Sequence, residues 1–188
     1  SNAFHGCRNL RVVIFNNGLQ KIGDNAFCSC KLLQNITLPS TVTEIGNNAF
    51  RSCRKLKKVE LNEGLQKIGM GSFDNCTSLE SITLPPTITE TYTRIAFNCC
   101  SNQQVVILND GVQNIGMFTF RNCTSLESIT LPLTLTEIGN GAFRECSNLK
   151  EVGLNGIPES WKREAFSNCG ALERFLFPII SHRLENII

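Results

Sequence analysis

The sequence predicts an α/β fold: a right-handed solenoid of about eight 23-residue coils, with a concave parallel sheet on one side and short helical or extended segments opposite. Three observations predict it. A Phe-x-x-Cys motif recurs at an almost constant interval, other apolar positions keep the same register, and the apolar spacing changes from three to two within each interval. One such unit cannot bury its apolar face alone, so the units must stack and share a core.

The Phe-x-x-Cys motif sets the period. Its intervals are 23, 23, 23, 24, 23, 23 and 23 residues. Repetition at a fixed period of this length is the sequence signature of a solenoid. We number the repeats 1 to 8 by their phenylalanines, which are Phe4, Phe27, Phe50, Phe73, Phe97, Phe120, Phe143 and Phe166. The paired cysteines are Cys7, Cys30, Cys53, Cys76, Cys100, Cys123, Cys146 and Cys169.

The first half of each repeat combines two local patterns. Phe50, Cys53 and Leu56 are spaced at three, which predicts a short helical turn with one buried stripe. Residues such as Ile36-Thr37-Leu38 then alternate between apolar and polar, which predicts a half-buried strand.

The second half of each repeat contains turn residues and a shorter extended segment. Pro39 in one repeat, and Asn62-Glu63-Gly64 in the next, are expected to end the strand. A second extended piece, Thr43-Glu44-Ile45, leads to Gly46, whose permissive backbone suits a corner.

These columns resemble a known family. The string Leu-x-x-Ile-x-Leu-Pro-x-Thr-Leu-Thr-x-Ile-Gly-x-x-Ala-Phe-x-x-Cys, matched almost letter for letter by residues 126–146, is similar to the BspA-like class of leucine-rich repeats. The resemblance covers residues 4–177 and implies a leucine-rich-repeat solenoid. It also implies a protein of the cell surface, or a secreted one, that adheres to host proteins or to other cells.

The predicted domain organisation is a single array over residues 4–177. The first three residues, Ser1-Asn2-Ala3, are typical of what tag cleavage leaves behind. Residues 178–188 break the pattern, so we expect a degenerate edge or a partial cap there.

Composition limits the partners. The chain of 188 residues has a formal net charge of +2, which predicts no general attraction to nucleic acid. No apolar run approaches the roughly 20 residues of a membrane helix, so no membrane insertion is expected in this sequence. The expected partner is a protein or another cell-surface macromolecule, and the sequence leaves the oligomeric state open.

The cysteine column allows three interpretations. Its members are stacked closely enough for disulfides, and cysteines are also zinc ligands. Each cysteine, however, lies three residues from a buried Phe and three from a buried Leu, which favours buried free thiols. Cys28 and Cys99 fall outside the column, and we expect them to be the exposed ones.

Catalysis finds no support in the sequence. The two histidines, His5 and His182, lie at opposite ends of the chain. Acidic residues follow repeat positions, and no phosphate loop, zinc-protease helix or nucleophile elbow is present. We therefore expect no enzyme activity, no cofactor and no metal.

One stretch departs from the repeat and supplies the candidate site. Outward strand positions fall eight and ten residues after each Phe, and most are small and polar, whereas Val105 and Ile107 are apolar and β-branched. The 24-residue interval inserts one residue between Glu90 and Ala96, near the single tyrosine, Tyr92. The hypothesis is a binding patch of Val105, Ile107, Ser81, Thr83, Ser128 and Thr130, with Tyr92 as a second site on the loop side. The alternative is drift in one imperfect repeat.

A charged column lies seventeen residues after each Phe. Its first four members are Lys21, Glu44, Lys67 and Glu90, which alternate in sign. The column predicts either a docking strip or a ladder of surface ion pairs. Alternating signs leave little net field, which favours the ladder.

Two function classes remain. The first is a non-catalytic module that binds a macromolecule through the concave face, as the architecture and the resemblance imply. The second is a structural spacer in a longer surface protein, which the regularity of the repeats favours.

Overall fold

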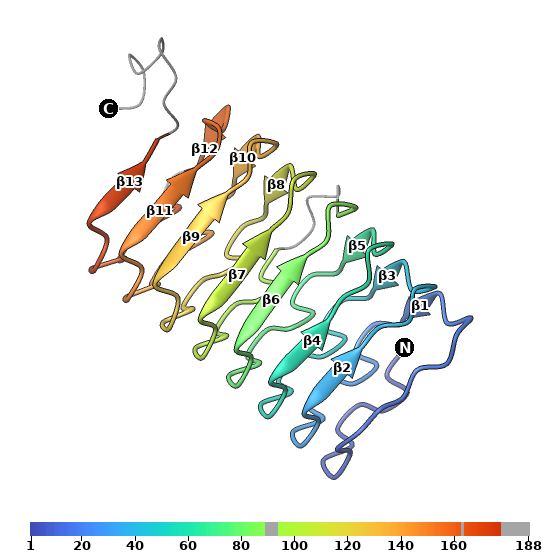
Figure 1. Ribbon diagram of the computed structural model, residues 1–188. Helices are drawn as coiled ribbons and strands as arrows, with labels where there is room; N and C mark the ends of the chain where they lie inside the picture. Colours follow the sequence, from blue (N-terminus) through green and yellow to red (C-terminus); the bar gives the residue numbers. More distant parts are fainter. Residues whose placement is uncertain (89–93, 163, 178–188) are drawn as a thin grey trace.

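The computed structural model describes residues 1–88, 94–162 and 164–177. The chain winds into a stack of similar turns, with the N-terminus at one end of the stack and β13 at the other (Figure 1). Within the described residues, the longer strands lie in one row and the shorter strands in a second row. This is the predicted parallel-sheet solenoid; its right-handed winding and its concave curvature stay predictions.

The longer strands form the main parallel sheet. Equivalent residues lie opposite each other, so Ile36 pairs with Val59 and Ser81 pairs with Val105. Inward residues such as Ile36 are buried and outward ones such as Thr37 are exposed, as the alternation predicts. The strands are β2 (Asn35–Thr37), β4 (Lys58–Glu60), β6 (Ser81–Leu84), β7 (Val105–Leu108), β9 (Ser128–Leu131), β11 (Glu151–Leu154) and β13 (Arg174–Leu176).

The shorter strands pair in the same parallel manner. They form two groups of three, in the orders β1-β3-β5 and β8-β10-β12. Their bounds are β1 (Lys21–Ile22), β3 (Glu44–Ile45), β5 (Lys67–Ile68), β8 (Asn114–Ile115), β10 (Glu137–Ile138) and β12 (Ser160–Trp161).

The expected short helical turns are wrong: within the parts that the structure describes, the Phe-x-x-Cys segments are chains of tight turns and no helix occurs. The spacing of three arises because the Cys53 N–H donates to the carbonyl of Phe50, three residues earlier. The backbone cannot continue into a helix because the residues two before and two after each Phe have positive φ. In repeat 3 these are Asn48 at 52° and Ser52 at 59°.

The solenoid has about seven turns, one fewer than predicted. The first repeat carries the Phe-x-x-Cys motif, but its outward residues Val12 and Ile14 lie in no strand. Their exposed fractions are 69 % and 84 %, so this segment lacks the half-buried environment that the later strands have. A repeat motif in the sequence therefore does not by itself produce a turn of the sheet.

Phenylalanine rings form a continuous stack through the core. Successive rings from Phe4 to Phe166 lie nearly parallel, with centroids 5.1 to 5.5 Å apart. The five rings from Phe50 to Phe143 are fully buried. Apolar surface shared between neighbouring repeats therefore holds the turns together.

The cysteine column lies beside the ring stack as free thiols. From Cys30 to Cys169, each Sγ is 3.1 to 3.4 Å from the carbonyl oxygen of the Phe one repeat earlier. Burial raises the pKa of the Cys76 thiol well above its usual value, so the thiol stays neutral. The expectation for Cys28 is wrong, because its side chain is buried; Cys99 is half-buried and Cys7 is exposed.

The glycines of three Ile-Gly pairs, Gly46, Gly69 and Gly139, are required by close approach and not by an unusual φ. Gly46 and Gly69 lack the positive φ that the permissive-backbone argument assumes. A Cβ on Gly69 would lie 2.6 Å from the backbone of Gly46 and Asn47 in the preceding repeat. The corners of successive repeats therefore touch backbone to backbone, which excludes any side chain.

Candidate binding surface

The outward residues of the longer strands form one continuous surface, which we call the strand face. Charged residues lie toward both ends of it and neutralise each other locally. Lys58 Nζ is 2.6 Å from Glu60 Oε1 in β4, and Arg174 pairs with Glu151 at 3.1 Å across β11 and β13. The hydrogen bond from Lys58, followed by one from Thr37, lowers the pKa of the Glu60 carboxyl. Repeats 4, 5 and 6 between them carry no charge on this face.

The structure brings the strand residues of the predicted patch together at the centre of the strand face. Ser81 lies opposite Val105 and Thr83 lies opposite Ile107, while Ser128 and Thr130 are on β9, the next strand. All six side chains are exposed. Val105 and Ile107 keep 48 % and 47 % of their surface in water, so two β-branched apolar residues stand in an otherwise small and polar patch.

The main sheet is divided at this patch. The ladder β2-β4-β6-β7 ends at β7, and β9 belongs to a separate ladder with β11 and β13. At the start of the strands, a backbone bond such as that from Gln104 N–H to Glu80 O joins each repeat to the one before it. The equivalent bond from Glu127 N–H to Gln104 O is missing, whereas the six other junctions have theirs.

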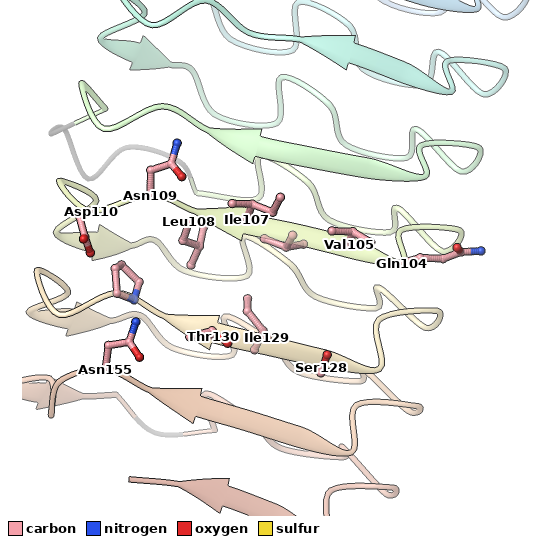
Figure 2. A pocket seen from close by; sticks show the side chains of 12 residues that line it. Gln104, Val105, Ile107, Leu108, Asn109, Asp110, Ser128, Ile129, Thr130 and Asn155 are labelled. Atoms are coloured by element: carbon pink, nitrogen blue, oxygen red, sulfur yellow. The ribbon is translucent and has the colours of Figure 1, made fainter. Parts of the chain in front are cut away.

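A cleft of about 420 Å³ lies over this division (Figure 2). Val105 and Ile107 line its middle, and Asn109, Asp110 and Asn155 gather at the end where the strands finish. Its remaining lining residues are Gln104, Val106, Leu108, Ser128, Ile129, Thr130 and Pro132. The cleft therefore joins an apolar centre to a polar end.

Reasoning from the sequence found the patch but missed the cleft. The available signal was Gln103, which replaces leucine in a buried column of the repeat that follows the 24-residue interval. Gln103 is fully buried, and its Nε2 donates to the Val105 carbonyl oxygen at 3.1 Å. A polar side chain under β7 marks the repeat at which the sheet divides.

The charged column lies on the row of shorter strands, away from the cleft. Glu44 bridges two neighbours, with Oε2 2.9 Å from Lys21 Nζ and Oε1 3.4 Å from Lys67 Nζ. The hydrogen bond from Lys21 is the main cause that lowers the pKa of Glu44. These contacts are the predicted ladder of ion pairs, while its fourth member, Glu90, lies outside the described residues.

Other predicted features fall elsewhere. Tyr92, His182 and the tail at 178–188 lie outside the described residues. Among the residues with described positions, no three His, Cys, Asp or Glu side chains gather closely enough to hold a metal ion. That same part of the chain contains no helix of the length and apolar character that crossing a membrane requires.

Comparison with protein families gives one assignment over nearly the whole chain. The model of the BspA type leucine rich repeat region matches in six copies, over residues 1–107 and 93–187. No curated protein sequence matches the chain.

Solved structures with this fold come from several bacteria. The leucine rich repeat protein of T. pallidum, TpLRR, is 34 % identical with a TM-score of 0.74, over 84 % of this chain and 74 % of that one. The pneumococcal vaccine antigen PcpA is 26 % identical with a TM-score of 0.57, over 87 % of this chain and 44 % of that one. A leucine-rich repeat protein from Bacteroides ovatus ATCC 8483 shares the fold, at 21 % identity and a TM-score of 0.58, over 94 % of this chain and 57 % of that one.

Proposed function

Because the chain belongs to the BspA-type leucine-rich repeat family, we propose that it is a non-catalytic module that binds a protein partner through the strand face of repeats 4 to 6. The observation that carries the proposal is the exposed pair Val105 and Ile107 at the centre of that face. Apolar anchors surrounded by small polar residues are the usual centre of a protein interface.

The charge distribution supports the same location. Ion pairs at both ends of the strand face satisfy their own charges, as Lys58 with Glu60 does. On the strand face itself, a partner would not have to strip water from an unpaired charge to reach the centre, where the apolar side chains gain most from burial. The cleft beside Ile107 adds a recess that a partner side chain can fill.

We place the module at the cell surface or outside the cell. The support is the resemblance to the vaccine antigen PcpA, which is 26 % identical to this chain. Adhesion to host proteins or to other cells is the specific role that we propose for it.

The test compares two matched double variants. We would measure binding of the protein to a panel of purified extracellular-matrix and host cell-surface proteins by biolayer interferometry. V105S/I107S should weaken the binding about tenfold or more, because two apolar contacts are lost. The control V12S/I14S makes the same changes at the same columns of repeat 1, where the side chains are also exposed, and should leave affinity unchanged.

Each result decides the question if both variants keep the wild-type melting temperature. Equal affinities of the wild type and V105S/I107S would remove the strand face of repeats 4 to 6 from the interface. Absence of binding to every protein of the panel would favour the second function, a spacer within a longer surface protein. The regular ring stack from Phe4 to Phe166 suits such a rod.

A further inference from the structure

Four repeats have asparagine twelve residues after the Phe, namely Asn16, Asn62, Asn109 and Asn155, and the other four have proline there. Asn62, Asn109 and Asn155 each follow a repeat with proline and lie just beyond the end of a longer strand. The Asn62 amide is fully used within the protein. Its Nδ2 donates to the carbonyl oxygens of Pro39 and Val42, both at 2.9 Å, and its Oδ1 accepts the Gly64 N–H at 2.8 Å.

Asn109 and Asn155 do not repeat this pattern. The Gly111 N–H, which corresponds to that of Gly64, donates instead to Thr134 Oγ1 at 2.9 Å in the following repeat. Within the residues whose positions are described, no hydrogen bond forms to the side-chain amide of Asn109 or Asn155. Both amides line the polar end of the cleft, where Figure 2 shows them on the two sides of it.

Asp110 supplies a carboxylate at the same end of the cleft. No lysine or arginine among the described residues forms an ion pair with it, whereas Glu60, Glu44 and Glu151 all have cationic partners. The adjacent repeats have the uncharged residues Pro86 and Leu133 at the position of Asp110. Of the residues that the structure describes, Asp110 is therefore the one unpaired charge that lines the cleft.

These groups together match an ammonium group on an aliphatic stem. A lysine ammonium carries three donors and no acceptor, and the cleft end offers a carboxylate and two amide oxygens. Apolar surface leads to them, since Val105 and Ile107 both line the cleft and are about half exposed. A lysine stem would cover such apolar side chains while its charged end reaches the oxygens.

We propose that the cleft binds an extended, lysine-containing segment of a protein partner. Its lysine ammonium is held by Asp110, Asn109 and Asn155, and its apolar residues lie on Val105 and Ile107. The division between β7 and β9 favours an extended segment, because the missing bond from Glu127 leaves the carbonyl oxygen of Gln104, a lining residue of the cleft, for a peptide main chain. This assignment rests on the proposed function and names the chemistry of the partner.

Three libraries of N-acetylated, C-amidated octapeptides test it. All contain valine at alternate positions; the first has a fixed lysine, the second acetyl-lysine and the third norleucine at the same position. We would measure binding to the wild-type protein by fluorescence anisotropy, at protein concentrations up to about 1 mM. The lysine library should bind about tenfold more tightly than the other two, and salt should weaken it.

Protein variants locate the effect. D110N and the double variant N109L/N155L should each weaken the lysine-library peptides about tenfold. The control E63Q removes an exposed acid at the same repeat position of repeat 3 and should leave binding unchanged. Equal binding of the lysine and acetyl-lysine libraries, equal effects of D110N and E63Q, or no binding by any library would overturn the assignment.

A fourth library separates the two sources of an ammonium group. Its peptides lack lysine and have a free α-amine; tighter binding than the lysine library would assign the site to a chain terminus and reject the lysine. The same variants distinguish a failure of the lysine assignment from a failure of the proposed function. If protein partners still bind to D110N and N109L/N155L but not to V105S/I107S, the strand face remains the interface and only the lysine assignment is rejected.

Discussion

The thiol of Cys76 donates a hydrogen bond to the carbonyl oxygen of Phe50 one repeat earlier, over 3.2 Å. The same carbonyl also accepts the Cys53 N–H, 3.2 Å away, within its own turn. Each cysteine of the column therefore links two neighbouring repeats while it fills the space beside the ring stack. This explains why the column requires a residue that is small, apolar and still able to donate.

Cys76→Ala should destabilise the protein by about 1–3 kcal/mol, because a buried sulfur and its hydrogen bond are both lost. Urea unfolding followed by circular dichroism measures the change. Cys7→Ala is the matched control, since Cys7 holds the same position in repeat 1 and is exposed. Equal losses for the two variants would show that the link between repeats contributes nothing.

Phe73→Ala should lower the free energy of unfolding by about 3–5 kcal/mol, the usual range for removing a fully buried ring from a core. Phe73 stacks on both Phe50 and Phe97, at 5.3 Å from each. Phe4→Ala, in the half-exposed ring at the end of the stack, should cost clearly less. The same unfolding measurement compares them, and similar costs at both positions would contradict a shared core.

Gly69→Ala should destabilise the protein by roughly 1–3 kcal/mol, because the new methyl group would collide with the backbone of Gly46 and Asn47. Gly170→Ala provides the control. A Cβ on Gly170 meets nothing within 4 Å, so its effect should stay within about 0.5 kcal/mol. Thermal unfolding of both variants decides whether close approach is the reason for glycine at the corner.

Burial was predictable from the sequence, and backbone conformation was not. Phe73, Cys76 and Leu79 are buried as expected because the same residue types recur in every repeat and can only share one core. Their spacing of three suits a helix and a chain of tight turns equally well. The distinguishing signal is the asparagine or glycine two before the Phe in five of the eight repeats, such as Asn48 or Gly71, since these types tolerate positive φ. The other three repeats reach the same φ with Ile95, Phe118 and Glu164, which give no such signal.

The candidate site was predictable only in part. Val105 and Ile107 stand out in the sequence because the repeats on either side of them have small polar residues in the same two columns. Gln103 marks the repeat concerned, but the cleft depends on two facts that only the structure shows: β7 does not pair with β9, and the amide of Asn109 lacks the partners that Asn62 has. Identical residues at one repeat position can therefore have different roles, which only the three-dimensional contacts distinguish.

Glu44→Gln should lower the melting temperature by only a few degrees, and only over a limited pH range, because Glu44 is a surface group. The folded pKa of Glu44 lies below its unfolded value of about 4.3. Its contribution is therefore present above that pH and is lost as the pH falls through the folded pKa.

The alkaline limit of the same contribution follows from Lys21. The hydrogen bond to Glu44 raises the pKa of Lys21. The stability that the ion pair contributes is therefore present below the unfolded pKa of lysine, about 10.4, and is lost as the pH rises through the folded pKa of Lys21. Melting curves of the wild type and Glu44→Gln should differ between these limits and converge beyond both. Glu63→Gln, at an exposed acid with no ion pair to a described residue, should show no such window. A difference that is independent of pH would contradict the ladder.

Asn62→Ala should destabilise the protein by about 1–3 kcal/mol, whereas Asn109→Ala and Asn155→Ala should each stay within about 0.5 kcal/mol of the wild type. The reason is the difference in their contacts. The Asn62 amide joins two repeats through Pro39 and Val42, while the other two amides make no such bond. Denaturant unfolding of the three single variants measures the contrast at one repeat position.

The contrast also decides what the cleft can recognise. If Asn109→Ala were as destabilising as Asn62→Ala, the Asn109 amide would be bonded within the protein and could not hold a ligand. A neutral effect on stability leaves its carbonyl oxygen available beside Asp110. The two measurements are therefore linked. Peptide binding beside Asp110 through the Asn109 amide requires that Asn109→Ala leave the free energy of unfolding unchanged.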